Sequence, residues 1–218
     1  MSAERANIFG LLCSDGNYRS YISRYVEFDK RSNKYYKRVK NTRILEFANT
    51  NFMLLKKFQK LLYFVYKYKP NITLSNNNVF RVCITKHYVI DDIIKDVNLG
   101  NNKWSIPKFV MDGNKNIKIG FIKGFFDGDG SVDFTKNKTP RIRIPSTNLM
   151  GLKQIKIVLN KLKIESNFNG PYKRENRKDG YEILLKKKSI ERFIKLIKSD
   201  HSKKKRRFKI IAEKLMPR

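Results

Sequence analysis

Apolar residues recur three or four positions apart in some stretches of this chain and alternate with polar residues in others. The first spacing is typical of a helix with one buried face, and the second is typical of a half-buried strand. Helical runs cover residues 8–16 and 122–130, which both end in Asp-Gly, and two more helices open at Thr50 and Thr147, where Thr or the following Asn can serve as the N-cap. Alternation predicts strands over residues 80–86 and 181–187.

These segments form two matching series, so the chain contains an internal repeat. Each copy predicts the order helix, two strands, helix, two strands, helix. The Asp-Gly runs lie 114 residues apart but the Thr-Asn helices only 97, so the first copy carries about 17 extra residues, in the hairpin between Tyr18 and Leu45. We predict a first repeat over residues 1–97, a connector over 98–116, a second repeat over 117–199 and a basic C-terminal tail or helix over 200–218.

The connector is rich in turn-forming residues at 98–102 and 112–114. Trp104, Ile106 and Phe109 are expected to pin it to the rest of the protein. The tail carries the run 201–207, which we interpret as a solvated basic segment leading into a short terminal helix.

Charge points to a polyanionic partner. The 218 residues include 49 Lys and Arg against 19 Asp and Glu, a formal net charge of +30, and nucleic acid is the obvious polyanion. No apolar run approaches the roughly 20 residues that span a bilayer, and no targeting signal is recognised, so we expect a soluble, intracellular protein. The two cysteines, Cys13 and Cys83, lie in apolar periodic segments and are interpreted as buried core thiols.

Small residues recur four positions apart in both Asp-Gly runs, Gly10 with Ser14 and Gly124 with Gly128. Each helix therefore has one face bare enough for close approach of another backbone. If the two helices pack along these faces, Asp15 and Asp129 lie side by side at the helix C-termini. Gly16 and Gly130 are then expected to act as left-handed C-terminal caps.

Two carboxylates at the negative ends of two helices need a compensating positive charge. A pair of divalent cations with oxygen ligands fits, and carboxylates and backbone carbonyls are the groups that Mg²⁺ selects. Two such metals can activate water on one side of a phosphodiester and stabilise the leaving oxygen on the other. Asp127 is interpreted as structural, because its counterpart in the first copy is Cys13, which cannot replace an oxygen ligand.

The two motifs, their order and the Trp-x-Ile-Pro connector closely resemble the LAGLIDADG homing endonucleases that carry two motifs in one chain. The resemblance runs from about Ala6 to Ser199. It implies an α+β fold of two pseudo-symmetric αββαββα repeats, with the motif helices paired at the interface and two curved antiparallel sheets forming a saddle over DNA. It also implies metal binding by Asp15 and Asp129, with the carbonyls of Gly16, Gly130 or adjacent residues as further ligands.

The same family places a basic residue at the end of the fourth strand and a polar residue after the second strand, near the scissile phosphates. Their positions in this chain are Lys86 and Lys187 for the basic residues, and Asn51 and Asn148 for the polar ones. A lysine there would polarise water or screen developing charge, and an asparagine would position water. Both asparagines can alternatively be helix caps.

DNA contacts should alternate with core residues along each strand. Arg141 and Arg143 share one face of a strand, and Ile142 and Ile144 share the other. Guanidinium groups on the exposed face can contact guanine in the major groove. The complete set of candidate DNA-binding residues is Arg19, Tyr21, Ser23, Tyr25, Arg38, Lys40, Arg43, Arg81, Lys136, Arg141, Arg143, Lys173 and Arg174.

The sequence thus predicts a monomeric, site-specific double-strand DNA endonuclease that uses two or more Mg²⁺ ions, with Mn²⁺ able to substitute, and leaves short 3′ overhangs as the family does. The alternative is an intron RNA maturase, or a DNA-binding regulator that keeps the fold without cleavage. A zinc or histidine nuclease is disfavoured, because His87 and His201 lie in different regions and no Cys-x-x-Cys spacing exists. An AT-rich archaeal or organellar host and an intron origin are expected.

Overall fold

The computed structural model describes residues 1–75, 77–99, 103–173 and 175–215, and within them the predicted repeat is present. The elements of the first unit, in order, are α1 (Ala3–Asp15), β1 (Gly16–Asp29), β2 (Lys34–Asn49), α2 (Phe52–Tyr66), β3 (Ile72–Leu74), β4 (Phe80–Ile84) and α3 (His87–Ile94). Those of the second are α5 (Lys115–Asp129), β5 (Ser131–Phe134), β6 (Pro140–Ser146), α6 (Leu149–Lys161), β7 (Ser166–Tyr172), β8 (Gly180–Leu185) and α7 (Lys187–Ile197). The mixed α+β fold of two αββαββα units is confirmed.

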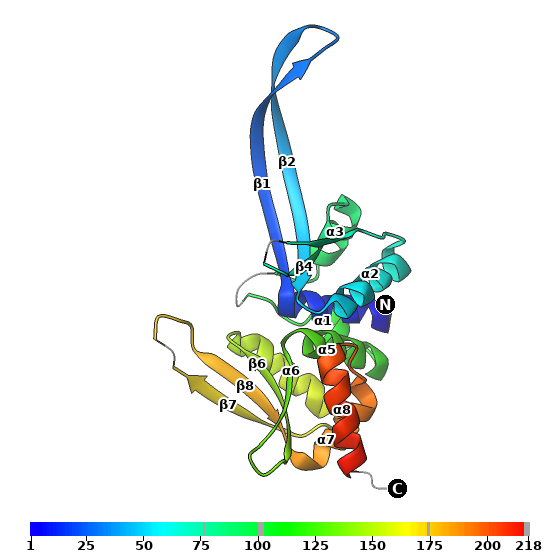
Figure 1. Cartoon of the computed structure of the whole chain (residues 1–218), viewed down its shortest axis with the longest axis vertical. Helices are drawn as coiled ribbons and strands as arrows, with labels where there is room; N and C mark the ends of the chain where they lie inside the picture. The colour runs from blue at the N-terminus through cyan, green and yellow to red at the C-terminus, as the bar shows by residue number, and fades with distance from the viewer. Residues whose placement is uncertain (76, 100–102, 174, 216–218) are drawn as a thin grey trace.

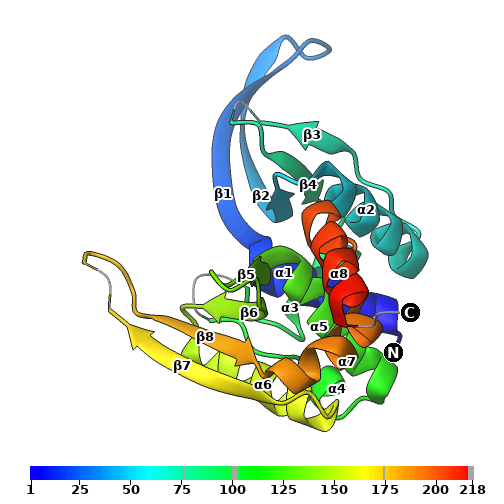
Figure 2. The same cartoon turned by 60° about the horizontal axis from the view of Figure 1, so that its bottom comes forward.

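Both units build the same sheet. Each contains four antiparallel strands, in the order β1-β2-β4-β3 and β5-β6-β8-β7, and the two sheets extend from the central helices toward the same side of the molecule (Figures 1 and 2). One face of each sheet forms the core. In the first sheet Leu45, Phe47 and Val82 on this face are fully buried.

The first hairpin is much longer than its counterpart. β1 and β2 contain 14 and 16 residues, against 4 and 7 in β5 and β6. Continuous pairing runs from Gly16 opposite Phe47 to Asp29 opposite Lys34, and the ribbon extends far beyond the body of the protein (Figure 1). The extra residues therefore lie in this hairpin, as predicted.

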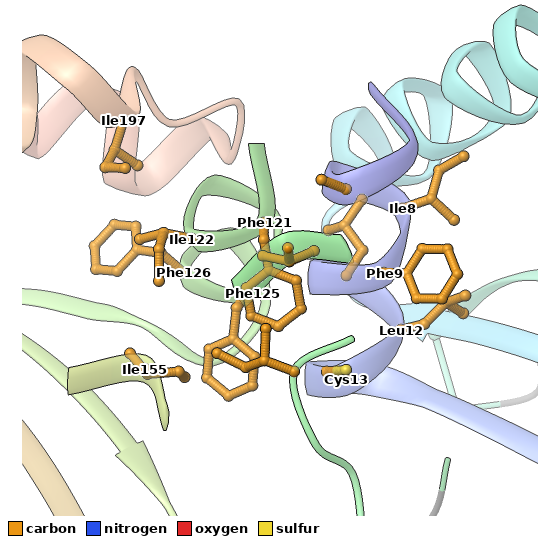
Figure 3. Close-up of a cluster of buried hydrophobic side chains, with 14 of the residues drawn as sticks. Ile8, Phe9, Leu12, Cys13, Phe121, Ile122, Phe125, Phe126, Ile155 and Ile197 are labelled. Atoms are coloured by element: carbon orange, nitrogen blue, oxygen red, sulfur yellow. The ribbon is translucent and has the colours of Figure 1, made fainter. Parts of the chain in front are cut away.

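The helices α1 and α5 pack backbone to backbone, as the small residues predicted. A Cβ added to Gly10 would clash with the backbone of Phe121 and lie 2.7 Å from the amide nitrogen of Phe125. A Cβ on Gly124 would clash with the carbonyl of Asn7. Large side chains lie on the outer faces of the pair, with Phe9 on one side and Phe126 on the other (Figure 3). Each motif helix thus belongs to both the interface and the core of its own unit.

The interpretation of Gly16 and Gly130 as left-handed caps is wrong. Both residues are extended, with φ of −83° and −64°, because each chain passes from the last helical residue directly into a strand. Glycine is needed there for space. A Cβ on Gly16 would lie 2.7 Å from the Cα of Leu12, and one on Gly130 would lie 2.6 Å from the carbonyl oxygen of Phe126.

The connector is pinned to both units, because the ring of Phe109 packs edge to face on that of Phe9 in α1, with 5.3 Å between the ring centroids. Trp104 and Ile106 are buried, and the ring of Trp104 packs 4.8 Å from that of Phe125. The amide of Ile106 donates a hydrogen bond to the side-chain oxygen of Gln154. A short helix, α4 (Lys108–Met111), leads into α5. The predicted turn residues 100–102 lie outside the described part of the chain.

The C-terminal segment contains the predicted helix, α8 (Ser202–Leu215), but the helix already includes most of the basic run and is docked on the protein, so the interpretation of that run as solvated is wrong. Lys204, Phe208 and Ile211 are buried at helical spacing, and Phe208 stacks on Phe126 at 5.6 Å. In Figure 2 α8 lies in front of the paired helices, and its Lys204 donates to backbone carbonyls at the end of α5. Among the described residues, no helix is both long and apolar enough to cross a membrane.

The cysteines are both free, but only Cys13 is a core residue. Cys83 was predicted in the core and instead lies half-buried on the opposite face of β4 from Val82 and Ile84, where its thiol contacts Glu46. Alternation in the short run around Cys83 predicted a strand but did not fix which face is buried.

Candidate active site and DNA interface

Asp15 and Asp129 are the last residues of α1 and α5, and the packing of these helices brings them together. A Cβ on Gly128 would lie 2.7 Å from Oδ2 of Asp15, so the Asp15 carboxylate lies against the residue that precedes Asp129. This juxtaposition is the one predicted from the spacing of small residues.

The surroundings of the two acids favour their protonated forms. Burial, followed by repulsion from Asp15, raises the pKa of Asp129 from 3.8 to about 7. Burial also raises the pKa of Asp15, opposed by a hydrogen bond from Asn49 and by the charge of Lys204. A pair of half-buried carboxylates with raised pKa values at helix C-termini is a site prepared for positive charge.

Part of that charge comes from Lys204 on α8. Its ammonium group donates to the carbonyls of Phe126, Asp127 and Gly128, at 2.6, 2.8 and 2.9 Å, and so caps the C-terminus of α5. Burial, only partly offset by the nearby acids, lowers the pKa of Lys204 to about 8. Lys204 also lowers the pKa of both Asp15 and Asp129 through its charge.

Asp127 anchors the segment that delivers this lysine. Its carboxylate, 1% exposed, accepts hydrogen bonds from the hydroxyl of Ser199 and from the amide of Asp200 at 3.0 Å. The same segment contacts the first unit, because the amide of Asn51 donates to Ser202 Oγ at 2.7 Å. Asp127 therefore has the structural role that the sequence suggested, and the C-terminal segment ties the two units together beside the acids.

His201 lies in this segment, half-buried and 3.2 Å from the amide nitrogen of Asn51. Burial and the charge of Lys204 lower its pKa to about 4, so the ring is neutral at neutral pH. It was expected to be part of a solvated tail. His87 begins α3 and is exposed, as an ordinary junction residue should be.

Asn49, rather than the predicted Asn51, contacts the acids. Its amide donates to Oδ2 of Asp15 at 3.0 Å. Asn51 and Asn148 are the N-caps of α2 and α6, and their side-chain oxygens accept from Leu54 and Gly151. The structure thus gives both predicted residues the capping role, and the equivalent of Asn49 in the second unit is Ser146.

Lys86 and Lys187 are exposed where β4 and β8 lead into α3 and α7. In the described part of the chain, the lysine whose charge acts on Asp15 and Asp129 is Lys204. The strands end earlier than predicted, at Ile84 and Leu185, so Lys86 is the N-cap of α3 and Lys187 is the first residue of α7. No contact between these lysines and the two acids is found in the described part of the chain.

The oxygen donors at this site suit a hard divalent cation. Two carboxylates and the carbonyls of the helix ends converge there, and the described residues contain no cluster of three or more Asp, Glu, His or Cys that would form a self-sufficient metal site. Such a site leaves coordination positions for water or phosphate.

In the first sheet, register sorts the DNA-binding candidates by face. Tyr18 pairs with Leu45 on the core side, so the neighbouring odd-numbered positions of β1 and even-numbered positions of β2 point to the other face. This exposed face carries the candidates Arg19, Tyr21, Ser23, Tyr25, Arg38, Lys40 and Arg81.

Arg43 lies on the opposite face of the first sheet from the other candidates. It pairs with Ser20 on the core side of the ribbon, where its guanidinium contacts Asp91 of α3 at 2.5 Å and the Tyr18 hydroxyl at 3.2 Å. The physical reason is that successive side chains of a strand point to opposite faces. Arg38 and Lys40 are an even number of residues apart and share a face, whereas Arg43 is an odd number of residues from both and lies on the other face.

In the second sheet, Arg141 and Arg143 lie on the face opposite the buried Ile142 and Ile144, as predicted. Lys136 and Lys173 are exposed in the β5–β6 and β7–β8 turns. Arg174 lies outside the described residues.

Sequence reasoning missed Lys204 and Asn49. Lys204 had a detectable signal, because it shares helical spacing with Phe208 and Ile211. Asn49 had none, since no local pattern shows which of two nearby asparagines reaches an aspartate 34 positions earlier.

Comparison with known proteins agrees with this architecture. Residues 116–198 match the model of the LAGLIDADG-like domain. The chain is also 24% identical over 164 residues to a glutamine–fructose-6-phosphate aminotransferase (isomerizing) of Methanocaldococcus jannaschii, a match that covers 72% of this chain but only 14% of that protein.

Two solved structures are similar over nearly the whole chain. Mesophilic variants of the homing endonuclease I-DmoI superpose with a TM-score of 0.62 at 18% identity, covering 89% of this chain and 90% of theirs. The LAGLIDADG homing endonuclease I-LtrWI, bound to target DNA, superposes with a TM-score of 0.60 at 12% identity, covering 98% and 91%. Residues 116–198 therefore match a LAGLIDADG-like domain, and the chain as a whole has the fold of the two-motif LAGLIDADG homing endonucleases.

Proposed function

We propose that this protein is a site-specific endonuclease that binds double-stranded DNA as a monomer and hydrolyses both strands. The observation that carries the proposal is the convergence of Asp15 and Asp129 at the ends of two helices, below two sheets whose exposed faces carry arginine and lysine. Similar structures include a complex of I-DmoI with DNA and Mn, of TM-score 0.58.

The donor set fits a divalent cation, and Mg²⁺ with Mn²⁺ as a substitute is the proposed cofactor. Asp15 and Asp129 would hold it, with backbone carbonyls at the helix ends. A bound divalent ion supplies a lowered pKa for water and charge stabilisation for the phosphorane. Water oxygen attacks phosphorus as the bond to the leaving sugar oxygen breaks; one proton of that water passes through solvent to the leaving oxygen, and the other stays on the new phosphate monoester or is released to solvent.

The chain's own residues then have distinct tasks. The exposed sheet faces bind phosphates and base edges and so fix the scissile bonds over the acids. Asn49 orients the carboxylate of Asp15 through its amide. Lys204 holds the end of α5 and reduces the repulsion between the acids. Two cuts near one shared site are proposed to leave short 3′ overhangs.

The test is to sequence the DNA ends that the purified protein produces in host genomic DNA, with Mg²⁺ or with EDTA. Asp129→Asn should abolish cutting and keep binding, while Asp112→Asn, an exposed acid at the end of α4, should cut normally. Paired ends at one locus, with wild-type protein and Mg²⁺ only, are expected. Tight binding without discrete ends would refute the nuclease and favour an RNA maturase or a regulator, and the same protein would then be assayed for splicing of its own intron RNA.

A further inference from the structure

An ion-pair triad lies on the exposed face of the first sheet, close to the motif helices. The carboxylate of Glu46 on β2 contacts Arg19 of β1 at 3.2 Å and Arg81 of β4 at 3.7 Å. The side chain of Glu46 is 11% exposed, whereas those of Arg19 and Arg81 are 50% and 41% exposed. A buried acid therefore holds two accessible guanidinium groups.

The second sheet has a triad of the same form. The guanidinium of Arg143 on β6 contacts Asp133 of β5 at 2.5 Å and Glu182 of β8 at 3.5 Å. Asp133 also accepts from Arg141, at 2.7 Å. Here one arginine is held between two acids.

Strand register shows that the central residues occupy equivalent positions. Glu46 pairs with Asn17, the second residue after the acid Asp15, and Arg143 pairs with Ser131, the second residue after Asp129. Each central residue is therefore paired with the residue two positions after the last residue of a motif helix, so the two occupy equivalent positions in their sheets.

The flanking residues are equivalent too. Arg19 and Asp133 both lie four residues after the acid of their motif. Arg81 lies on β4 and Glu182 on β8, the strands next to β2 and β6 in the two sheets. Each lies one residue before a buried residue, Val82 or Ile183. At these three equivalent positions the charges are therefore positive, negative, positive in the first unit and negative, positive, negative in the second, where Arg141 adds a further positive group beside Asp133.

These two patterns suit different base edges. Accessible guanidinium groups donate to acceptors such as O6 and N7 of guanine, and carboxylates accept from the exocyclic amines of cytosine and adenine. Mutual ion pairing fixes the side chains of both triads before DNA binds, which reduces the entropy lost in recognition. The Nε groups of Arg81 and Arg143 are buried without a hydrogen-bond partner among the described residues, so neither guanidinium is fully satisfied within the protein.

We infer that the two triads are matched specificity determinants that read opposite hydrogen-bonding patterns at pseudo-symmetric positions of the target. The Arg19–Glu46–Arg81 triad selects guanine edges on its side of the cleavage centre. The Asp133–Arg143–Glu182 triad selects amine-bearing cytosine or adenine edges next to the base that Arg143 contacts. The target is therefore non-palindromic at these positions. This inference rests on the proposed function.

The experiment transplants one triad onto the other sheet. The variant Arg19→Asp/Glu46→Arg/Arg81→Glu gives the first sheet the charge pattern of the second without touching the core face. Wild-type and variant proteins select bound DNA from a library randomised across the target, in EDTA so that cleavage does not intervene. Arg43→Gln, on the core face of the same sheet, is the control.

The transplant should replace the guanine preference on the first side by a preference for amine-bearing bases, by about 10- to 100-fold, and leave the second side unchanged. Arg43→Gln should select the wild-type sequence. If the triple variant has a much lower melting temperature than the wild type, the single variants Arg81→Gln and Glu182→Gln replace it in the selection. Each is expected to lose selectivity at one base pair on its own side of the target. If folded variants keep the wild-type base preferences, the inferred role of the triads is wrong and the proposed function still stands. If the wild-type protein itself selects no sequence, both the inference and the proposed function are wrong.

Discussion

The ammonium nitrogen of Lys204 lies 2.9 Å from the carbonyl oxygen of Gly128, the residue that precedes Asp129. This contact joins the last helix of the chain to the end of the second motif helix. A helix C-terminus carries partial negative charge, and here it also carries two converging carboxylates. The fold therefore supplies a cation of its own at the place where the proposed metal ions bind.

Lys204→Met should destabilise the protein and alter its metal binding. Three buried carbonyls would lose a charged donor, so the free energy of unfolding should fall by about 2–4 kcal/mol. The positive charge of Lys204 also repels a metal ion at the two acids. Its removal should therefore tighten Mn²⁺ binding in calorimetric titrations without DNA. Lys205→Met, at the exposed neighbouring position, is the control and should change neither quantity.

Asp129 should make stability fall between about pH 4 and pH 7 in EDTA, whereas His201, whose pKa is lowered to about 4, contributes a rise over part of the same range. The pKa of Asp129 is 3.8 in its ordinary state and about 7 in the fold. Between these values the folded state binds the extra proton, so the free energy of unfolding decreases as pH rises, by on the order of 2–4 kcal/mol in total. Thermal melts across this range should show the stability of the wild type falling relative to that of Asp129→Asn, since both proteins keep His201, and Mg²⁺ should restore stability to wild-type protein near pH 7. Parallel curves for the two proteins would contradict the raised pKa.

Gly124→Ala should disrupt the pairing of the motif helices. The added methyl group would collide with the carbonyl of Asn7 and approach the amide of Leu11 to 2.9 Å, and neither backbone group can move without separating the helices. We expect a loss of about 3 kcal/mol or more in urea unfolding, together with loss of cleavage. Asn116→Ala, on the exposed surface of the same helix, should unfold like the wild type.

Arg38 and Arg43 should differ in their contribution to DNA binding although they lie five residues apart on one strand. Arg38→Gln removes a cation from the exposed face, so the log–log dependence of affinity on salt should lose about 0.9 in slope if one phosphate contact is lost. Arg43→Gln removes the contact to Asp91 and should leave that slope unchanged. Fluorescence anisotropy at several salt concentrations distinguishes them, and equal slopes for both variants would contradict the assigned faces.

Shortening of the first hairpin should shorten the DNA footprint on one side only. Ser23 and Lys40 are paired, so replacement of residues 24–39 by Asn-Gly keeps the register of the remaining ribbon. Each deleted residue removes about 3.4 Å of strand, close to the rise of one base pair. Protection should retreat on the flank bound by the first unit, and symmetrical retreat would show that the hairpin does not follow the DNA.

The sequence by itself determined the repeat, the type and order of the elements, and the meeting of Asp15 with Asp129. These features depend on local periodicity and on spacing within a helix. Gly10 and Gly124 are informative because only a close backbone contact requires small residues at those positions, and helical geometry then fixes where each acid lies. Likewise, alternation placed Arg141 and Arg143 on one face.

The tertiary structure alone decided which partners those residues meet. Arg43 turned to the core side because register depends on pairing with the neighbouring strand, and Lys204 became buried because α8 docks on a surface made by distant segments. Asn49 rather than Asn51 reached Asp15 for the same reason. Contacts between residues far apart in sequence depend on the packing of whole elements. A local pattern reports that packing only where it limits residue size, as at Gly10 and Gly124, and it does not show the strand register or the docking surface that placed Arg43, Lys204 and Asn49.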